Sequence, residues 1–475
     1  MARTICIVAL CLLVMCSSAA QAALISSVGL DIQSRPYRAL STKLDVGSVI
    51  VESAHAAVWK ASGIVPTVAN GLVAWADGRA GEVTIMGFDL IAPLNIATPT
   101  RNGEFLISQF SNDWQEGNPF VGKDAVNNKR AVVYDTVQLS AADLGNIEGS
   151  NPPSAPGQVI WTAGRQLTPV LVNPTATSVS QNVVGWINYP TGAGQTNGLD
   201  NNEIWIKPTA GAVPPPAALT GATNITPNSP NRREHLAGNG NTPVWQEFRS
   251  VGAYMPWAIA AYNRGPNTTT YFDPPADPTT GQPTKNFTQP DVCGNLLVYT
   301  QEENPAAAGN NPLLLHTNIY FRDLANSSAG AIAITTQGTA EKPAISKTTT
   351  VVNGQPIDCY VVVWQDHRTD ATTSSFPGGN GETDYNWDIW GQEIRFNAGT
   401  GQYALFMDPF LIRSDVGRQT NVDIDGRDVV WQSQAPGSQD IYVWGAIVPE
   451  PCTLGLVLAG AGLSVLRRRP AKNPL

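Results

Sequence analysis

The sequence predicts an all-β fold: a single β-propeller of about seven blades, preceded by a signal peptide and followed by a hydrophobic sorting helix. A short apolar strand motif that ends in Trp or Tyr recurs seven times, at intervals of 52–67 residues. The 475 residues include 43 Gly and 36 Pro, which indicates frequent turns. Charged residues make up 14% of the chain, below the roughly 25% of an average globular protein.

Each copy of the motif is an apolar strand closed by an aromatic residue, here called the anchor. Apolar runs of four to eight residues that are bounded by turn signals are typical of buried strands. An aromatic residue at a fixed place in every repeat is expected to pack between neighbouring sheets rather than to bind a ligand. The seven anchors are Trp75, Tyr134, Trp186, Trp245, Tyr299, Trp364 and Trp431.

Five copies continue into a further strand, in which a polar or acidic residue precedes Ile and usually an aromatic residue. These segments are Thr84-Ile85-Met86, Glu203-Ile204-Trp205, Asn318-Ile319-Tyr320, Asp388-Ile389-Trp390 and Asp440-Ile441-Tyr442. Gly71, Gly294 and Gly426 precede three anchors and predict tight turns. The predicted unit is therefore a strand, a Gly turn, the anchor strand, a hairpin loop and the aromatic strand.

Repeats of several short strands predict propeller blades, because one sheet cannot bury both of its faces alone and a ring packs each sheet against the next. The motif resembles the TolB-like propeller repeats of secreted and cell-surface bacterial proteins, most closely at residues 361–394 and 423–445. The second and fourth copies depart from the pattern: their candidate strands are Val159-Ile160-Trp161 and Trp257-Ala258-Ile259. Six blades is therefore the alternative count. A strand at residues 27–32 is expected to close the ring.

The N-terminus predicts export through the secretory pathway. Arg3 precedes an apolar run, and Ala20-Gln21-Ala22 has the small-x-small pattern of a cleavage site. These features are typical of a secretory signal peptide, assigned to residues 1–22.

The C-terminus combines a Pro-rich hinge, an uncharged segment and a basic end. Pro449-Glu450-Pro451 is followed by residues 452–466, which carry no charge, and then by Arg467, Arg468 and Arg469. As a helix the uncharged segment would be about 22 Å long, slightly short for a stable span of roughly 17–25 residues. It suits transient insertion in the inner membrane, with permanent insertion as the alternative, and the arginines should stay cytoplasmic.

This tail resembles the PEP-CTERM sorting signal of bacterial surface and matrix proteins. The resemblance implies that an exosortase-type sorting protease cuts near Pro449, Glu450 and Pro451. The chain then divides into a signal peptide (1–22), a propeller (23–448) and a sorting signal with a short transmembrane segment (449–475). The exported body is expected to be membrane-tethered through its C-terminus, then at the cell surface or in the extracellular matrix.

The charge of the exported body excludes nucleic acid as a partner. The whole chain carries −9; without the signal peptide (net +1) and the tail (net +3), the body carries about −13. Nucleic-acid phosphates require a basic surface.

Only two of the six cysteines lie in the body, Cys293 and Cys359, at nearly equivalent places in consecutive repeats. Export permits a disulfide between them, and two separate buried thiols is the alternative. No metal-binding spacing of cysteine or histidine is present, so no metal and no cofactor is predicted.

The hairpin loops that follow the anchors differ in length. The interval from anchor to the aromatic-strand position is 11 residues in the first and last copies, but 19, 21 and 26 in the third, fifth and sixth. Strands cannot absorb extra residues without losing register, so the additions lie in the loops. Equivalent hairpins of a propeller emerge on one face, which is therefore the candidate binding surface.

The loop of the sixth copy is the richest in residues that suit a polysaccharide. Aromatic rings stack on sugar faces, and carboxylates accept hydrogen bonds from hydroxyl groups. A solvated loop without a ligand is the alternative. The candidate ligand-binding residues are Asp366, Asp370, Asp384, Tyr385, Trp387 and Asp388.

No catalytic residue is predicted, because the sequence contains no Gly-x-Ser-x-Gly elbow, Walker loop or His-Glu-x-x-His motif. The sequence favours an exported, non-catalytic propeller that binds polysaccharide or a surface protein through its loop-rich face. A propeller glycoside hydrolase or lyase is an alternative, because its paired carboxylates would come from distant blades. A structural matrix protein is the third hypothesis.

Overall fold

The computed structural model describes residues 37–39 and most of residues 66–447. The main gaps in that range are 91–103, 139–156, 173–182, 189–202, 209–222, 304–315 and 369–386. The predicted signal peptide, the predicted closing strand at 27–32 and the predicted sorting signal lie outside the described residues. The described elements are all β-strands, as predicted.

The described strands form seven sheets that succeed one another along the chain. The first contains β2 (Thr67–Ala69), β3 (Leu72–Asp77), β4 (Thr84–Asp89) and β5 (Glu104–Leu106); the second contains β6 (Trp114–Asp124), β7 (Lys129–Gln138) and β8 (Gly157–Val159). The third contains β9 (Gln166–Val172), β10 (Val183–Asn188), β11 (Glu203–Pro208) and β12 (Thr223–Asn224). The fourth contains β13 (Arg233–Ala237), β14 (Val244–Phe248), β15 (Trp257–Asn263) and β16 (Thr268–Phe272).

The remaining sheets follow the same order. The fifth contains β17 (Lys285–Cys293), β18 (Leu296–Glu303), β19 (His316–Asp323) and β20 (Ile332–Ala333). The sixth contains β21 (Ala340–Val352), β22 (Gln355–Asp366), β23 (Asp388–Asn397) and β24 (Gln402–Arg413). The seventh contains β25 (Arg418–Asp425), β26 (Asp428–Gln434) and β27 (Ile441–Ile447), and β1 (Tyr37–Ala39) from the N-terminal end.

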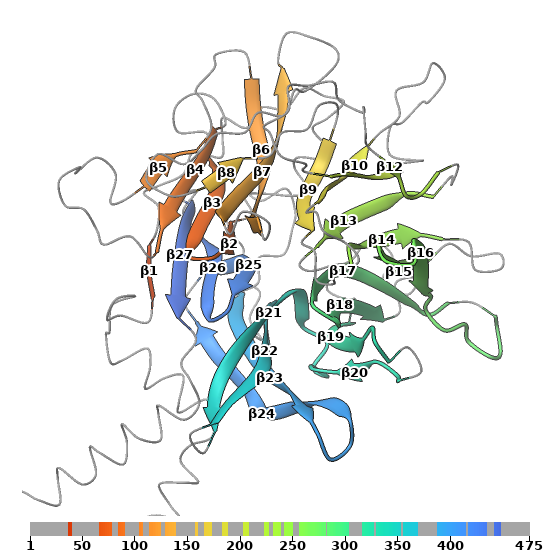
Figure 1. The fold of residues 1–475 in the computed structure, drawn as a ribbon. Helices are drawn as coiled ribbons and strands as arrows, with labels where there is room; N and C mark the ends of the chain where they lie inside the picture. Colours follow the sequence, from red (N-terminus) through yellow and green to blue (C-terminus); the bar gives the residue numbers. More distant parts are fainter. Residues whose placement is uncertain are drawn as a thin grey trace, which may run out of the picture.

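The sheets are arranged around a common centre, with the first strand of each sheet nearest to it (Figure 1). This is the arrangement of a β-propeller. An N-terminal strand completes the seventh sheet, as expected, but it is β1, which pairs antiparallel with β27 from Tyr37↔Ala446 to Ala39↔Trp444. The first and seventh sheets are also in direct contact, because the backbone N–H of Val68 donates to Asp423 Oδ2 at 2.8 Å.

The strand register supports most of the predicted repeat. Each anchor lies in the second strand of its sheet, and in four sheets it pairs with the predicted aromatic-strand position: Trp75↔Met86, Trp186↔Trp205, Tyr299↔Tyr320 and Trp364↔Trp390. The seventh sheet differs, because Trp431 pairs with Trp444, and Tyr442 pairs with Ser433. The observed interval there is therefore two residues longer than the expected 11, because β27 contains two pairs of a β-branched and an aromatic residue, Ile441-Tyr442 and Val443-Trp444.

The two irregular copies behave differently. In the fourth sheet, Trp257-Ala258-Ile259 begins β15 and pairs antiparallel with the anchor strand, so this copy forms a complete sheet. In the second sheet, Val159 of the candidate segment ends β8, which pairs with β7 in parallel, and Ile160 and Trp161 lie outside the described residues. A hairpin cannot produce a parallel pair, so the connection from β7 to β8 at residues 139–156 is a crossover and not a hairpin.

Gly71, Gly294 and Gly426 lie in the tight turns between the first and second strands, as predicted. Their φ angles are 70°, 59° and 60°, a region that glycine adopts without steric cost. Asn70 precedes Gly71 and also has a positive φ, of 50°, as expected for an Asn-Gly hairpin turn.

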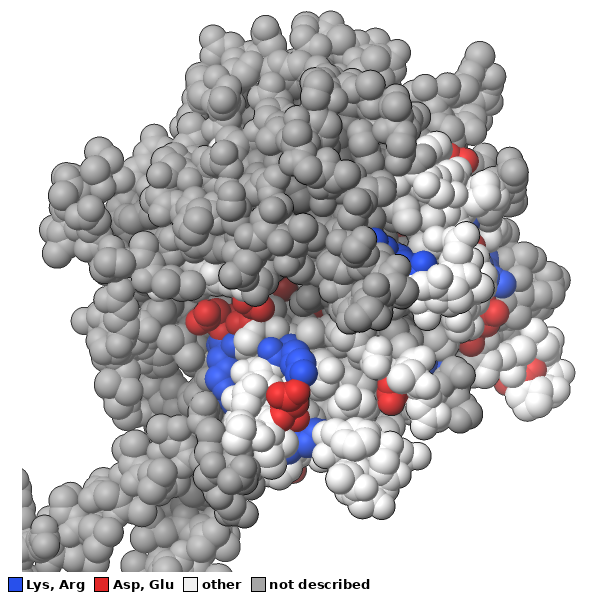
Figure 2. All heavy atoms as spheres, in the orientation of Figure 1, with Lys and Arg blue, Asp and Glu red and all other residues white. Residues whose placement is uncertain are grey.

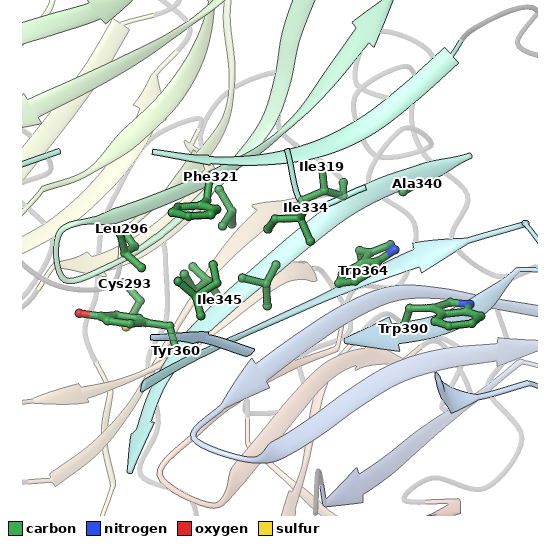
Figure 3. Packing of buried hydrophobic residues seen from close by; sticks show 13 residues of the cluster. Cys293, Leu296, Ile319, Phe321, Ile334, Ala340, Ile345, Tyr360, Trp364 and Trp390 are labelled. Carbon is green, nitrogen blue, oxygen red and sulfur yellow. The ribbon is translucent and has the colours of Figure 1, made fainter. Parts of the chain in front are cut away.

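The core lies between adjacent sheets. Trp75, Trp245, Trp364 and Trp431 are fully buried, so the predicted packing role of these anchors is confirmed. Figure 3 shows the cluster between the fifth and sixth sheets, where Phe321 and Leu296 lie near Ile345, and Ile334 lies near Trp364. A buried Trp removes roughly 150–250 Å² from water, worth roughly 4–6 kcal/mol of transfer free energy.

Candidate functional site

The predicted ligand-binding residues lie at the hairpin between β22 and β23, but the structure describes only the base of this loop. Asp366 ends β22, Asp388 begins β23, and the two are paired across the strands. Asp370, Asp384 and Tyr385 lie outside the described residues. Asp366 and Asp388 are fully buried and Trp387 is 8% exposed. Ligand binding by the six residues stays a prediction.

The carboxylate of Asp366 is surrounded by donors from the protein. Oδ2 accepts from the indole N–H of Trp364 at 3.0 Å and from Arg368 Nε at 2.7 Å. Oδ1 accepts from the Thr339 hydroxyl at 2.6 Å and from the Arg368 backbone N–H at 2.9 Å. Asp366 therefore joins the anchor Trp364, the start of the loop at Arg368 and Thr339, which precedes β21.

Aromatic contacts extend this base. The Arg368 guanidinium lies 4.3 Å from the ring centroid of Trp390, within cation–π range. His367 and Trp387 meet edge to face, with ring centroids 4.8 Å apart. The Trp387 carbonyl accepts the Gln419 backbone N–H at 3.0 Å, which joins the base of the loop to the seventh sheet.

The fourth sheet contains an equivalent carboxylate, which accepts hydrogen bonds from an anchor indole and an arginine. Trp245 Nε1 donates to Glu247 Oε2 at 2.9 Å, and Arg233 Nε donates to the same oxygen at 3.0 Å. In both sheets the acidic residue stands two positions after the anchor. This arrangement was not among the predictions, although the segments Trp245-Gln246-Glu247 and Trp364-Gln365-Asp366 contain it. The acid at this position satisfies a buried indole N–H, which would otherwise cost free energy.

A second set of polar residues lies on the first strands, around the centre of the ring. Each of four first strands contains a β-bulge with one residue of positive φ. These residues are His235, Gln289, Lys342 and Asn421, with φ between 49° and 54°. Such non-Gly conformations are uncommon and persist only where the surroundings fix them.

Bonds between sheets hold three of these bulges. The backbone N–H groups of Gln289 and Asn421 donate to Gln246 Oε1 at 2.8 Å and to Gln365 Oε1 at 3.1 Å. Lys342 N donates to Thr300 Oγ1 at 3.2 Å and to Gln289 Oε1 at 2.9 Å. Gln246, Thr300 and Gln365 each follow an anchor directly. We call this bond the clasp: the residue after an anchor accepts from the bulge of the next sheet.

Two carboxylates occupy equivalent positions on the first strands of the fifth and seventh sheets, and each contacts the next sheet. Asp291 Oδ2 accepts the Ile345 backbone N–H, and Oδ1 accepts that of Val292, both at 2.8 Å. Asp423 makes the same pair of bonds, with Val68 and Ile424. Every carboxylate oxygen of the pair is thus bound to a backbone amide of its own or the next sheet.

Burial raises the pKa of Asp291 to about 7, and repulsion from Asp423 adds to the effect. Burial likewise raises the pKa of Asp423 to about 6, against the opposing bonds from Val68 and Ile424. Both groups therefore change charge near neutral pH.

Cys293 and Cys359 are buried free thiols in the structure. Burial is the main cause that raises the pKa of each to about 12. Both therefore remain protonated at neutral pH, where a thiol is a poor nucleophile.

Within the described ranges, no group of three or more His, Cys, Asp or Glu side chains could hold a metal ion. The described part of the chain also contains no helix that is long and apolar enough to cross a membrane; the predicted sorting helix is not in that part. Figure 2 shows acidic and basic side chains intermixed over the region of β21–β26, without a surface of a single sign.

No family model and no curated protein matches this sequence. Among solved structures, the chain is similar to a prolyl endopeptidase (TM-score 0.41, 11% identity, covering 93% of this chain and 52% of the other). It is also similar to the β-propeller domain of the Trilobed protease from Pyrococcus furiosus (0.37, 10%, 81% and 95%) and to Trypanosoma rangeli sialidase (0.35, 9%, 87% and 58%). The chain spans about half the length of the prolyl endopeptidase.

The raised pKa values predict that stability falls as the pH rises through neutrality. The folded chain binds protons at Asp291 and Asp423 more tightly than the unfolded chain, whose aspartates titrate near 3.8. The free energy of unfolding should therefore decrease from about pH 4 to above pH 7. Urea midpoints at pH 5, 6, 7 and 8 measure this slope, which the double variant Asp291→Asn, Asp423→Asn should reduce.

The matched control is Asp358→Asn. Asp358 is exposed and paired with Lys347, and its pKa is lowered by that partner. The control should keep the wild-type slope between pH 5 and 8. An unchanged slope in the double variant would refute the assignment. Absolute midpoints are not the readout, because Asn cannot accept both backbone N–H groups.

Proposed function

We propose that this chain is an exported, non-catalytic, seven-bladed β-propeller that is sorted to the cell envelope or extracellular matrix. It binds polysaccharide or a surface protein through the face from which the hairpins between second and third strands emerge. The seven successive sheets, and the first-to-seventh contact through Val68 and Asp423, support the count of seven.

One observation carries the choice of face. Three long connections lie between the second and third strands of the third, fifth and sixth sheets, at residues 189–202, 304–315 and 367–387, whereas two connections of 14 residues, 90–103 and 209–222, join third and fourth strands on the opposite side. Because these sheets are antiparallel at those strands and stand around one centre, the three connections leave on the same side. The turns at Gly71, Gly294 and Gly426 leave on the other side.

Both ends of the loop in the sixth sheet are fixed to the propeller, which favours ligand binding by the residues between them. Asp366 and Arg368 fix the start of the loop, and the Trp387 carbonyl fixes its end to the seventh sheet. A loop with anchored ends loses less conformational entropy when it binds a ligand. The ligand contacts would then come from Asp370, Asp384 and Tyr385, between the two anchored ends.

The arrangement of the central carboxylates favours binding over hydrolysis. A glycoside hydrolase needs one carboxylate as acid and a second as base or nucleophile, both free to reach substrate. In Asp291 and Asp423, both carboxylate oxygens instead accept hydrogen bonds from backbone amides.

The test replaces residues 370–385 by a short Gly-Asn turn and leaves Asp366, Arg368 and Trp387 intact. Retention on isolated exopolysaccharide of the producing cells, and on their protein-stripped surface, should fall at least tenfold. The control shortens the β21–β22 hairpin at residues 350–355, on the opposite face, and should bind normally. Equal retention of both variants would refute the proposed face.

The sorting signals support export and tethering through the tail. An exosortase-type protease is the proposed partner, with transient or permanent inner-membrane insertion of residues 452–466. Mass spectrometry of the mature protein is expected to find a C-terminus near Pro451. A mature protein that still ends at Leu475 would contradict cleavage, and permanent insertion of residues 452–466 in the inner membrane would then be the remaining alternative.

A further inference from the structure

The sixth sheet is larger than its neighbours and ends in a long edge strand. Its strands β21–β24 contain 13, 12, 10 and 12 residues. The outermost strands β5, β12, β16 and β20 contain only two to five residues. In Figure 1 the sixth sheet projects outward from the ring, with β24 along its outer side. Among the described strands, β24 pairs only with β23.

The projecting part of this sheet exposes apolar side chains. Phe396 is 50% exposed, Leu405 37% and Met407 49%. Tyr403 packs edge-on against Phe396, with ring centroids 5.2 Å apart. Residues 396–407 contain no charged side chain, and the hairpin tip is uncharged on the face seen in Figure 2. An open edge with such side chains is a template for another strand.

We infer that this edge pairs antiparallel with the same edge of a second copy of the chain, beyond the ligand binding proposed above. Residues 402–406 pair with β23 without a register shift, so their outer side offers a regular row of backbone groups. A two-fold axis at Ala404 would pair Tyr403 with Leu405 of the second copy, and Gln402 with Phe406. Aromatic–aliphatic pairs stabilise antiparallel sheets, and a two-fold contact closes without forming fibres.

A second copy fits this edge because the register about Ala404 is self-complementary and the edge carries no charge. Two bodies of about −13 each repel one another over most of their surfaces, and contact is least opposed where both are uncharged. The segment Gln402–Phe406 meets that condition in both copies, since no like charges face each other in this register. Of the described outermost strands, β24 alone combines this length with exposed apolar side chains.

The test uses opposite charges at Ala404, which is exposed. In Ala404→Lys, two lysines would face each other across the axis, and in Ala404→Glu two glutamates would. Light scattering of the full-length purified protein, measured against concentration, should show a dimer for the wild type. The dimer of each variant alone should have a dissociation constant up to roughly fivefold higher than that of the wild type, since like charges directly opposite cost up to about 1 kcal/mol. An equal mixture of the two variants should restore the dimer.

The control is Thr270→Lys, at an exposed position of the edge strand β16 in the fourth sheet, which should dimerise like the wild type. Equal thermal midpoints would show that all variants fold. A monomeric wild type at 100 μM overturns the inference, even if β24 captures a peptide from another protein. Dimers that ignore both the single substitutions and the mixture overturn it as well.

Discussion

The constraint on which this fold depends is that a sheet with apolar side chains on both faces, such as the fifth or the sixth, cannot cover both alone. The chain meets it by placing each sheet between two others. Trp75, Trp245, Trp364 and Trp431 fill the spaces between sheets and are fully removed from water. Polar bonds then fix the angle at which neighbouring sheets meet, through the clasp that follows an anchor. The common orientation of the hairpin loops is a consequence of this packing.

The same packing explains why several residues that look like a site are structural. Buried indole, guanidinium and backbone N–H groups need acceptors in a low-dielectric interior, where an unpaired polar group is costly. Asp366 and Glu247 accept from indole and arginine groups, and Asp291 and Asp423 accept from backbone amides of the next sheet. These carboxylates stabilise the sheets of the propeller, and we propose that ligand binding depends on the loops between the strands.

The sequence predicted the strands, the anchors and the glycine turns because these depend on local rules. A glycine in a turn, or an aromatic residue at the same place in every repeat, can be recognised without knowing which strands lie next to it. The register of β27 was missed, because Tyr442 and Trp444 both fit the pattern and only the pairing with β26 chooses between them. The clasp and the bonds of Asp291 and Asp423 to the next sheet could not be predicted from spacing, since their partners are 42–56 residues away, or 355 across the closure. The recurrent Trp-Gln dipeptide was the available signal.

Hydrogen exchange at the Val68 amide tests the central claim most directly, because this group joins the first sheet to the last. We expect Val68 to exchange as slowly as Ile345, which donates the equivalent bond between the fifth and sixth sheets. Asp423→Ala should accelerate exchange at Val68 and leave Ile345 unchanged. Rapid exchange at Val68 in the wild type, with Ile345 protected, would mean that the sheets do not meet around one axis.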